Sequence, residues 1–333
     1  MSSRAFRGTA AAALVFLLVQ LGALALVPSF EASGYQQFEN PQDPTNSLVY
    51  ILLILVMTGL MLAAFKYDFD WVVRAFVVFT SGLLAWYVLG VFLPGIAAVP
   101  LSALIAVALW VYPEWYVIDA AGVVMGAGAA GLFGISFGIL PAILLLAVLA
   151  VYDAVSVYGT EHMLDLAEGV MDLRIPVVLV IPLTLGFSIL PEEDGDGAEN
   201  DGGTEEGDQS DDEGSEVQEA VSDESAVEGE APDVADRDAF FIGLGDAVMP
   251  TVLVASAAHF SPAAPLDLGI DFALNLPALT AMVGTFLGLF VLLRMVFAGR
   301  AHAGLPLLNG GAIGGYLVGS VAAGVPILTA LGL

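Results

Sequence analysis

Two aspartates stand out because each lies well inside a long apolar stretch of the chain. Asp153 lies in LAVLAVYDAVSVYG, and Asp246 lies in FIGLGDAVMP. A carboxylate within the hydrocarbon of a bilayer costs about 3 kcal/mol on insertion scales, so its presence there indicates a function. Two carboxylates brought close together do not both ionise readily, so one can hold a proton while the other acts as a base. Such a pair could activate water against a peptide carbonyl and protonate the leaving amine, which is aspartyl proteolysis.

The two carboxylates are predicted to lie at the same depth in the membrane. Membrane spans over residues 139–158 and 239–260 would be antiparallel, so the first ends at the face where the second begins. At the rise of an α-helix, Asp153 is then about 8 Å from that face and Asp246 about 10 Å. A third acid, Asp119 in PEWYVIDAAG, lies close to a predicted span edge, and we interpret it as a boundary residue.

The composition is that of a polytopic membrane protein. Of the 333 residues, 58% are hydrophobic and only 13% are charged, which is not the balance of a soluble globular domain. Only 8 residues are Lys or Arg, which excludes a phosphate-tracking nucleic-acid surface. The absence of cysteine excludes disulfides, thiolate nucleophiles and cysteine-ligated metals. The excess of acid over Lys is typical of halophilic proteins from a salt-saturated cytoplasm.

Nine apolar stretches are long enough to cross a bilayer, which needs about 20 residues per helix. The N-terminal stretch is longer than the apolar core of a signal peptide, so we count it as the first span. A tenth run within 175–190 is β-branched and interrupted by proline, and we do not count it. The predicted fold is therefore an all-α polytopic membrane protein. Its nine transmembrane helices cover residues 8–28, 47–65, 71–93, 96–112, 117–137, 139–158, 239–260, 274–296 and 304–331.

The basic residues support this count, because Lys and Arg collect in cytoplasmic loops. With nine spans and a cytoplasmic N-terminus, every basic residue lies on the cytoplasmic side and the C-terminus is external. Counting 175–190 as a tenth span would move three of them outside. The residues concerned are Arg4, Arg7, Lys66, Arg74, Arg174, Arg237, Arg294 and Arg300.

The spans divide the chain into four segments. Residues 1–174 contain six transmembrane helices, and residues 239–333 contain three. Residues 175–190 form an apolar, strand-like interfacial segment. Residues 191–238 hold more than half of the 36 acidic residues and almost no large apolar side chain, so this cytoplasmic loop is predicted to be disordered.

Three motifs resemble those of a known family. Tyr152 precedes Asp153, residues 243–246 read GLGD, and AGLPLLNGGAIGGY opens the last predicted span. Together they resemble the Tyr-Asp, Gly-x-Gly-Asp and Pro-Ala-Leu signatures of the presenilin and signal peptide peptidase family of intramembrane aspartyl proteases, in an archaeal form. The order of the motifs, the nine spans and the hydrophilic loop after the sixth span agree with that family over essentially the whole chain.

The resemblance implies an intramembrane aspartic endopeptidase whose catalytic pair is Asp153 and Asp246. Active-site support would come from Tyr152, Gly243, Gly245, Pro306, Leu307 and Leu308. The third motif departs from the family pattern, because Leu307 stands where alanine is usual. A Pro-Ala-Leu sequence does occur at residues 277–279, but it opens a span at the opposite face of the membrane, and we discount it.

The substrate helix must unwind, because its scissile carbonyl is otherwise held in helical hydrogen bonds. An apolar strand beside the site could pair with the unwound segment, which is β-augmentation. The resemblance places such a segment before the seventh span. The residues predicted to pair with the substrate are Pro176, Val177, Val178, Leu179 and Val180.

Two other functions remain open from the sequence. A proton-coupled transporter or cation channel would use the same intramembrane acids as a relay, and an inactive relative would serve as a scaffold for membrane helices. The predicted partners are transmembrane peptides or proteins and the lipid bilayer, with a homo-oligomer also possible. No cofactor, metal or nucleic acid is expected.

Overall fold

The computed structural model describes residues 3–159, 178–183, 187–189, 239–266, 273–298 and 303–333. Its helices are α1 (Ser3–Ala32), α2 (Thr45–Lys66), α3 (Asp70–Phe92), α4 (Gly95–Val111), α5 (Trp115–Ser136), α6 (Ile139–Gly159), α8 (Leu244–Phe260), α9 (Leu276–Val296), α10 (Gly304–Ala322) and α11 (Ile327–Ala330). Its strands are β1 (Val178–Pro182) and β2 (Ala239–Gly243). The predicted acidic loop and the predicted site residues Pro176 and Val177 lie outside the described residues.

The described helices match the predicted membrane spans. Seven of them, α1, α2, α3, α5, α6, α9 and α10, are long and apolar enough to cross a membrane. Two shorter apolar helices, α4 and α8, have 17 residues each and stand where the fourth and seventh spans are predicted. The all-α polytopic membrane architecture is thereby confirmed, and the helix ends depart clearly from prediction in two places.

The first departure is the predicted span over residues 239–260, which is a strand followed by a helix. Residues 239–243 form β2, and α8 begins at Leu244 with Gly243 as its N-cap. Phe240, Phe241 and Ile242 are aromatic or β-branched, and such residues favour a strand where a partner strand is available. The span prediction was wrong here because hydropathy alone does not separate an apolar strand from an apolar helical turn.

The second departure is at the C-terminus, where the predicted span over residues 304–331 is too long. Helix α10 ends at Ala322, and Gly324 follows with a φ of 77°, in the left-handed region that glycine adopts at helix ends. The short helix α11 then packs against α10, and its Ala330 carbonyl accepts a hydrogen bond of 2.7 Å from the Tyr316 hydroxyl. A glycine turn therefore ends the last long helix early.

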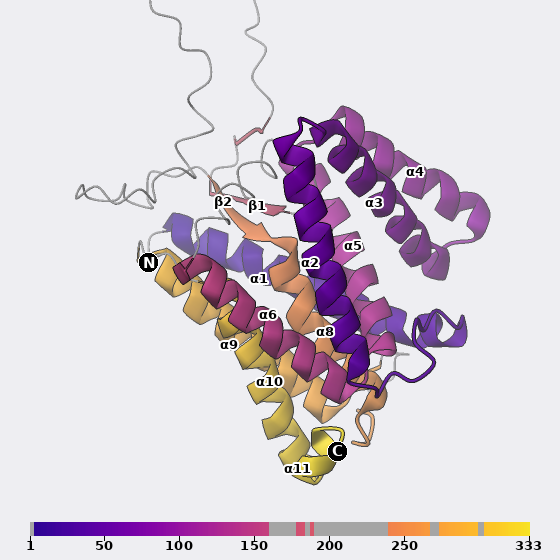
Figure 1. Cartoon of the computed structure of the whole chain (residues 1–333), viewed down its shortest axis with the longest axis vertical. Helices are drawn as coiled ribbons and strands as arrows, with labels where there is room; N and C mark the ends of the chain where they lie inside the picture. The colour runs from indigo at the N-terminus through magenta and orange to yellow at the C-terminus, as the bar shows by residue number, and fades with distance from the viewer. Residues whose placement is uncertain (1–2, 160–177, 184–186, 190–238, 267–272, 299–302) are drawn as a thin grey trace, which may run out of the picture.

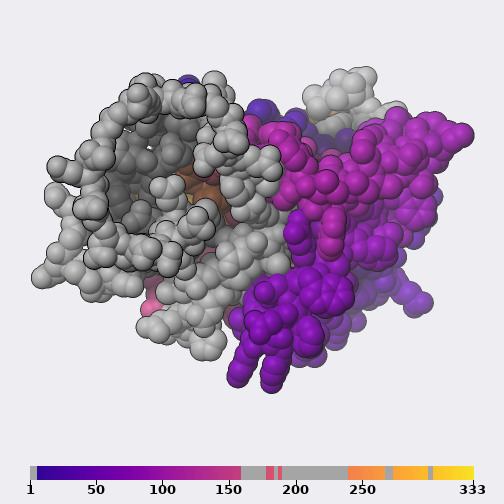
Figure 2. All heavy atoms as spheres, turned by 90° about the horizontal axis from the view of Figure 1, so that it is seen from above, coloured from indigo at the N-terminus to yellow at the C-terminus, as the bar shows by residue number. Residues whose placement is uncertain are grey.

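Helix α8 lies at the centre of the bundle. Its residues from Pro250 to Ala257 are all buried, and it contacts α1, α5, α6, α9 and α10. Figure 1 shows α6, α9 and α10 together on one side of the molecule and α3 and α4 on the other. Seen from above, the purple and magenta residues of α2 to α5 occupy one side (Figure 2). The first turn of this central helix carries Asp246.

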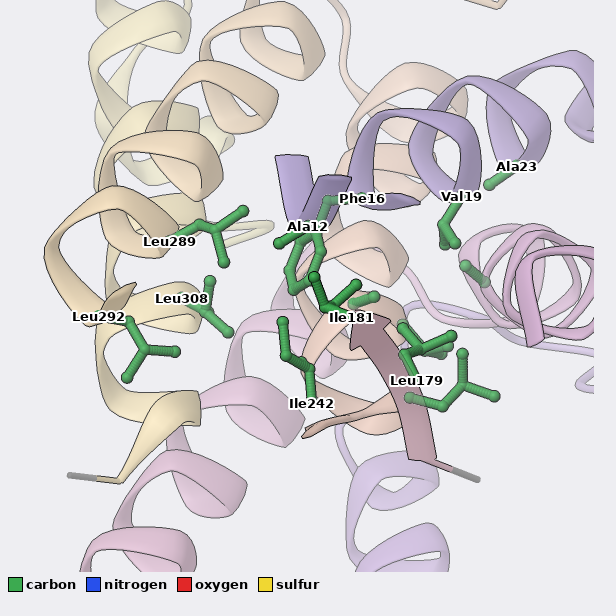
Figure 3. Packing of buried hydrophobic residues seen from close by; sticks show 14 of the residues in the cluster. Ala12, Phe16, Val19, Ala23, Leu179, Ile181, Ile242, Leu289, Leu292 and Leu308 are labelled. Carbon is green, nitrogen blue, oxygen red and sulfur yellow. The ribbon is translucent and has the colours of Figure 1, made fainter. Parts of the chain in front are cut away.

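The two strands form an antiparallel sheet at the end of the bundle where α8 begins. The register pairs Val180 with Phe241 and Leu179 with Ile242. Leu179 and Ile181 are fully buried, which stabilises the fold by roughly 1.5–3 kcal/mol for each side chain. They belong to a cluster that joins the sheet to α1, α9 and α10 (Figure 3). Its further members include Ala12, Phe16, Val19, Leu289, Leu292 and Leu308.

Glycines allow α9 and α10 to approach until their backbones touch. A Cβ atom at Gly284 would collide with the backbone of Gly311, and a Cβ atom at Gly288 would collide with the backbone of Leu307. Small residues at helical spacing permit this kind of packing between membrane helices. We call the contact formed by Gly284, Gly288, Gly311 and Gly315 the glycine seam. It fixes the position of α10 against α9.

Candidate active site

Asp153 lies in the last part of α6 and is buried, with 8% of its surface exposed. Its Oδ2 accepts a hydrogen bond of 3.0 Å from the Leu305 N–H. Leu305 is the second residue of α10, and the N-cap residue Ala303 has no side chain that could cap the helix. Asp153 therefore accepts from one of the N–H groups that a helix leaves without a partner at its start. The positive end of the α10 dipole also favours a carboxylate there.

Asp246 lies in the first turn of α8 and is partly exposed. Its carboxyl group packs on two glycines from different elements. A Cβ atom at Gly304 would be 3.2 Å from the Asp246 Oδ2, and a Cβ atom at Gly243 would be 3.6 Å from the same oxygen. The carboxyl group therefore lies directly over Gly304, the first residue of α10. A residue larger than glycine at this position would displace it.

The two carboxyl groups meet at the start of α10. Asp153 binds the N–H of Leu305, and Asp246 packs on the neighbouring Gly304. We call these four residues the aspartate site. Two carboxyl groups that interact in this way can share one proton, so that one is an acid while the other is a base. The predicted pair is thus brought together, and α10 is the element that joins its two members.

Asn309 is a further link between α6 and α10 that the sequence did not reveal. Its side chain is fully buried, and its Nδ2 donates a hydrogen bond of 3.0 Å to the Leu146 carbonyl of α6. This bond lies one to two helical turns from the bond between Asp153 and Leu305. Two polar contacts and the glycine seam therefore fix α10, and with it the aspartate site.

The third predicted motif follows the aspartate site directly, in the first turns of α10. The Leu307 carbonyl contacts Gly288 across the glycine seam, and Leu308 is fully buried in the cluster of Figure 3. The other Pro-Ala-Leu sequence begins at Pro277, whose Cα lies 2.9 Å from a Cβ placed on Gly319. Gly319 is about 22 Å along α10 from its first residue. The sequence at 277–279 is therefore remote from the aspartates.

The remaining predicted site residues differ in their surroundings. Tyr152 is 46% exposed and lies on the outer face of α6, although it is next to Asp153 in sequence. A Cβ atom placed on Gly245 would meet no described atom within 4 Å, so there is open space at this position. Val178 and Val180 belong to β1, which pairs with β2. Within the described ranges, no group of three or more His, Asp or Glu side chains is arranged to hold a metal ion.

Asp119 lies near the start of α5, as expected of a boundary residue, and it makes a contact that the sequence did not reveal. Its Oδ1 accepts a hydrogen bond of 2.8 Å from the Val180 N–H, so this acid attaches β1 to α5. The donor is a backbone N–H group far away in the sequence. Every residue except proline has such a group, so residue types do not indicate this bond. Only the unusual position of the acid in an apolar stretch could have drawn attention to it.

The comparisons with known proteins identify the family of the chain. A family model described as signal-peptide peptidase, presenilin aspartyl protease matches residues 13–325. A presenilin family intramembrane aspartate protease solved in space group C222 is 31% identical, with a TM-score of 0.62 over 94% of this chain and 99% of the solved chain. The structure in space group P2 is 30% identical, with a TM-score of 0.60 over 93% and 96% of the two chains. No curated protein sequence gives a significant match.

The fold and these matches define an intramembrane aspartyl protease. The chain belongs to the signal peptide peptidase and presenilin family. The predicted resemblance and the predicted class of enzyme are confirmed, and the lipid bilayer is the environment in which its transmembrane substrates are cleaved.

Proposed function

We propose that Asp153 and Asp246 are the catalytic pair of this protease. The observation that carries the proposal is their convergence on Gly304 and Leu305 at the start of α10. The ionised carboxyl group takes a proton from water as the water oxygen attacks the scissile carbonyl, and the protonated one donates to the developing oxyanion. The C–N bond then breaks as a proton passes to the leaving amine. Loss of cleavage after replacement of either carboxyl group tests this mechanism.

The alternative of a transporter or channel uses the same two acids as a relay. The matched family and both solved structures are proteases, and none of these comparisons supports transport. The two functions differ in their products, because a protease divides a transmembrane peptide into two fragments whereas a relay moves ions. Proteolysis is the function that the aspartate site supports better.

We assign supporting roles to the neighbours of the pair. Gly243 has no side chain beside the carboxyl group of Asp246, which a Cβ atom there would approach to 3.6 Å, and Gly245 leaves open space in which an extended substrate can lie. Pro306 is the third residue of α10, where a helix leaves N–H groups without a partner, so proline fits there without the loss of a helical hydrogen bond. Leu307 and Leu308 hold that turn against α9 and the buried cluster. Tyr152 is exposed on α6, where it can contact a substrate helix.

We infer that the substrate adds to the sheet at the edge of β2. In an antiparallel pair, residues that face each other alternate between exchanging hydrogen bonds and pointing their N–H and C=O groups outward. The Val180 N–H points to Asp119, so Val180 and Phe241 form an outward-pointing pair. Strand β1 packs against α5 and α1, whereas β2 contacts chiefly β1 and the helix that follows it. The outward N–H and C=O groups of Phe241 and Gly243 therefore form a row along β2 that ends next to Asp246. Residues 178–180 contribute by holding β2 in place.

Proline substitutions distinguish the two edges of the sheet. Phe241→Pro removes an outward N–H group but no bond between the strands, and proline is tolerated at such edge positions. We expect cleavage to fall about tenfold, since a hydrogen bond to the substrate is lost. Phe241→Ala is the control for the aromatic ring, and Val178→Pro is the matched change on β1. Peptide cleavage measured at several substrate concentrations gives the result. A stronger loss in Val178→Pro than in Phe241→Pro would show that the substrate pairs with β1.

Gly304→Val is expected to displace the carboxyl group of Asp246. A Cβ atom at residue 304 would lie 3.2 Å from Oδ2, and the added methyl groups would come closer still. A shift of about 1 Å at a reacting group can lower kcat about a hundredfold, and we expect a loss of this size in a peptide-cleavage assay. Gly310→Val is the control on the same helix, because a Cβ atom there meets no described atom within 4 Å. Equal activity of the two variants would contradict the close contact.

We also infer the orientation that the basic residues indicate, with the N-terminus and the acidic loop cytoplasmic and the C-terminus external. Thr9 and Arg294 line one pocket, so the start of α1 and the end of α9 lie at the same end of the bundle. That end carries the basic residues typical of a cytoplasmic face.

The acid excess supports an archaeal, halophilic source, and a homo-oligomer stays a prediction.

A further inference from the structure

Asp119 is an acid of the membrane region that the proposed catalytic step does not use. It lies in the second turn of α5 and is partly buried. Its hydrogen bond to the Val180 N–H is 2.8 Å long, and a bond to a charged acceptor is stronger than one between neutral groups. An acid within an apolar region is costly to maintain. Its contact with one strand amide is therefore a feature that needs an explanation.

A second acid, Glu114, attaches residues 187–189 to the same helix. Glu114 is buried, N-caps α5, and accepts hydrogen bonds from the Ser188 hydroxyl at 2.5 Å and the Ile189 N–H at 3.4 Å. Strand β1 and residues 187–189 are thus held on the first turns of α5 by two carboxyl groups. Asp119 differs from Glu114 because it alone binds the strand itself, at the edge that faces away from β2.

We propose that Asp119 is a positioning residue that caps the outer edge of β1 and so restricts an extended substrate to the edge of β2, beside Asp246. This inference rests on the proposed function. An uncapped edge strand accepts other extended segments. A segment added to β1 would lie about 14 Å, or three strand spacings, from one added to β2, and would be out of reach of Asp246. Asp119 therefore excludes an unproductive mode of binding.

Hydrogen exchange tests the cap without any substrate. In Asp119→Ala the Val180 amide loses its acceptor, and we expect its exchange to accelerate about tenfold or more. The amides of Leu179 and Ile181 face β2 and should keep their protection. Asp119→Asn retains the Oδ1 acceptor without its charge and is the matched control, with exchange much closer to that of the wild type than in the alanine variant. Unchanged exchange at Val180 in the alanine variant, or equal acceleration at all three amides, would overturn the proposal.

Disulfide cross-linking tests the steering of the substrate. The chain has no cysteine, so a cysteine introduced at Phe241 or at Val178 is its sole thiol. A transmembrane peptide with a cysteine in its extended segment should cross-link to position 241, because facing residues on neighbouring strands are within reach. Adding Asp119→Ala should increase cross-linking at position 178 severalfold and raise KM more than it lowers kcat, and Asp119→Asn should restore both.

The outcomes separate this inference from the proposed function. Cross-linking at position 178 without the Asp119 substitution, or at neither position, would overturn the role of Asp119. Cross-linking at position 241 without any cleavage by the protein that retains both aspartates would refute the proposed catalytic step. In that case the assignment of Asp119 to substrate positioning would still stand.

Discussion

Asp153→Ala and Asp246→Ala are each expected to reduce peptide cleavage about a thousandfold or more, which is within the range of acid–base catalysis by positioned groups. Each substitution removes one member of the proposed catalytic pair, so the remaining carboxyl group has no partner for proton exchange. The double variant should be no less active than either single variant, because residues that act as a unit give non-additive losses. Cleavage of a labelled transmembrane peptide in detergent measures all three.

The control for these variants is Asp70→Ala, which removes an exposed acid from the first turn of α3. We expect it to cleave at the rate of the wild type. The melting temperature of each variant separates loss of chemistry from loss of fold, because Asp153 also caps α10. An additive loss in the double variant would contradict a catalytic unit, and so would substantial activity in either single variant.

Gly311→Val is expected to have the second largest effect, on both stability and activity. A Cβ atom at residue 311 would collide with the backbone of Gly284, and backbone cannot move aside as the end of a flexible side chain can. Overpacking typically costs about 1–3 kcal/mol, and we expect the upper end of that range. The displaced α10 would carry Gly304 and Leu305 away from the aspartates, so cleavage should fall about a hundredfold. Thermal unfolding in detergent and peptide cleavage measure the two losses.

Gly314→Val is the matched control for the seam. It makes the same change in the same helix, but a Cβ atom there meets no described atom within 4 Å. It should retain most of the stability and activity, since valine is no worse a helix former than glycine. Similar losses in the two variants would mean that a valine side chain anywhere on this helix is harmful, and that the contact with α9 is not responsible.

The bundle could be predicted because its signals are local. A bilayer requires long apolar segments, and hydropathy therefore located the helices. The basic residues favoured nine spans over ten, and the run at 175–190 contains β1 where residues are described. The two acids could be singled out for the same reason, since an acid in such a segment is conspicuous. Their convergence could only be inferred from depth and from the resemblance to a family.

The details that position the site could not be predicted, because they depend on contacts between distant backbone groups. Ala239–Gly243 has the composition of either a strand or a helical turn, and pairing with β1 decides between them. The link between Asn309 and Leu146, like that between Asp119 and Val180, ends on a backbone atom that every residue possesses. The sequence shows that a polar group is present, whereas the fold decides which distant segment it holds.

The most direct test of the central claim is mass spectrometry of a transmembrane peptide incubated with the purified chain in liposomes made in heavy-oxygen water. If Asp153 and Asp246 together hydrolyse a peptide bond, the wild type yields two fragments, the new C-terminus carries the heavy oxygen, and Asp153→Asn and Asp246→Asn yield neither fragment. An intact peptide with the wild type, together with proton or cation flux that depends on the two aspartates, would contradict the account and support a transporter.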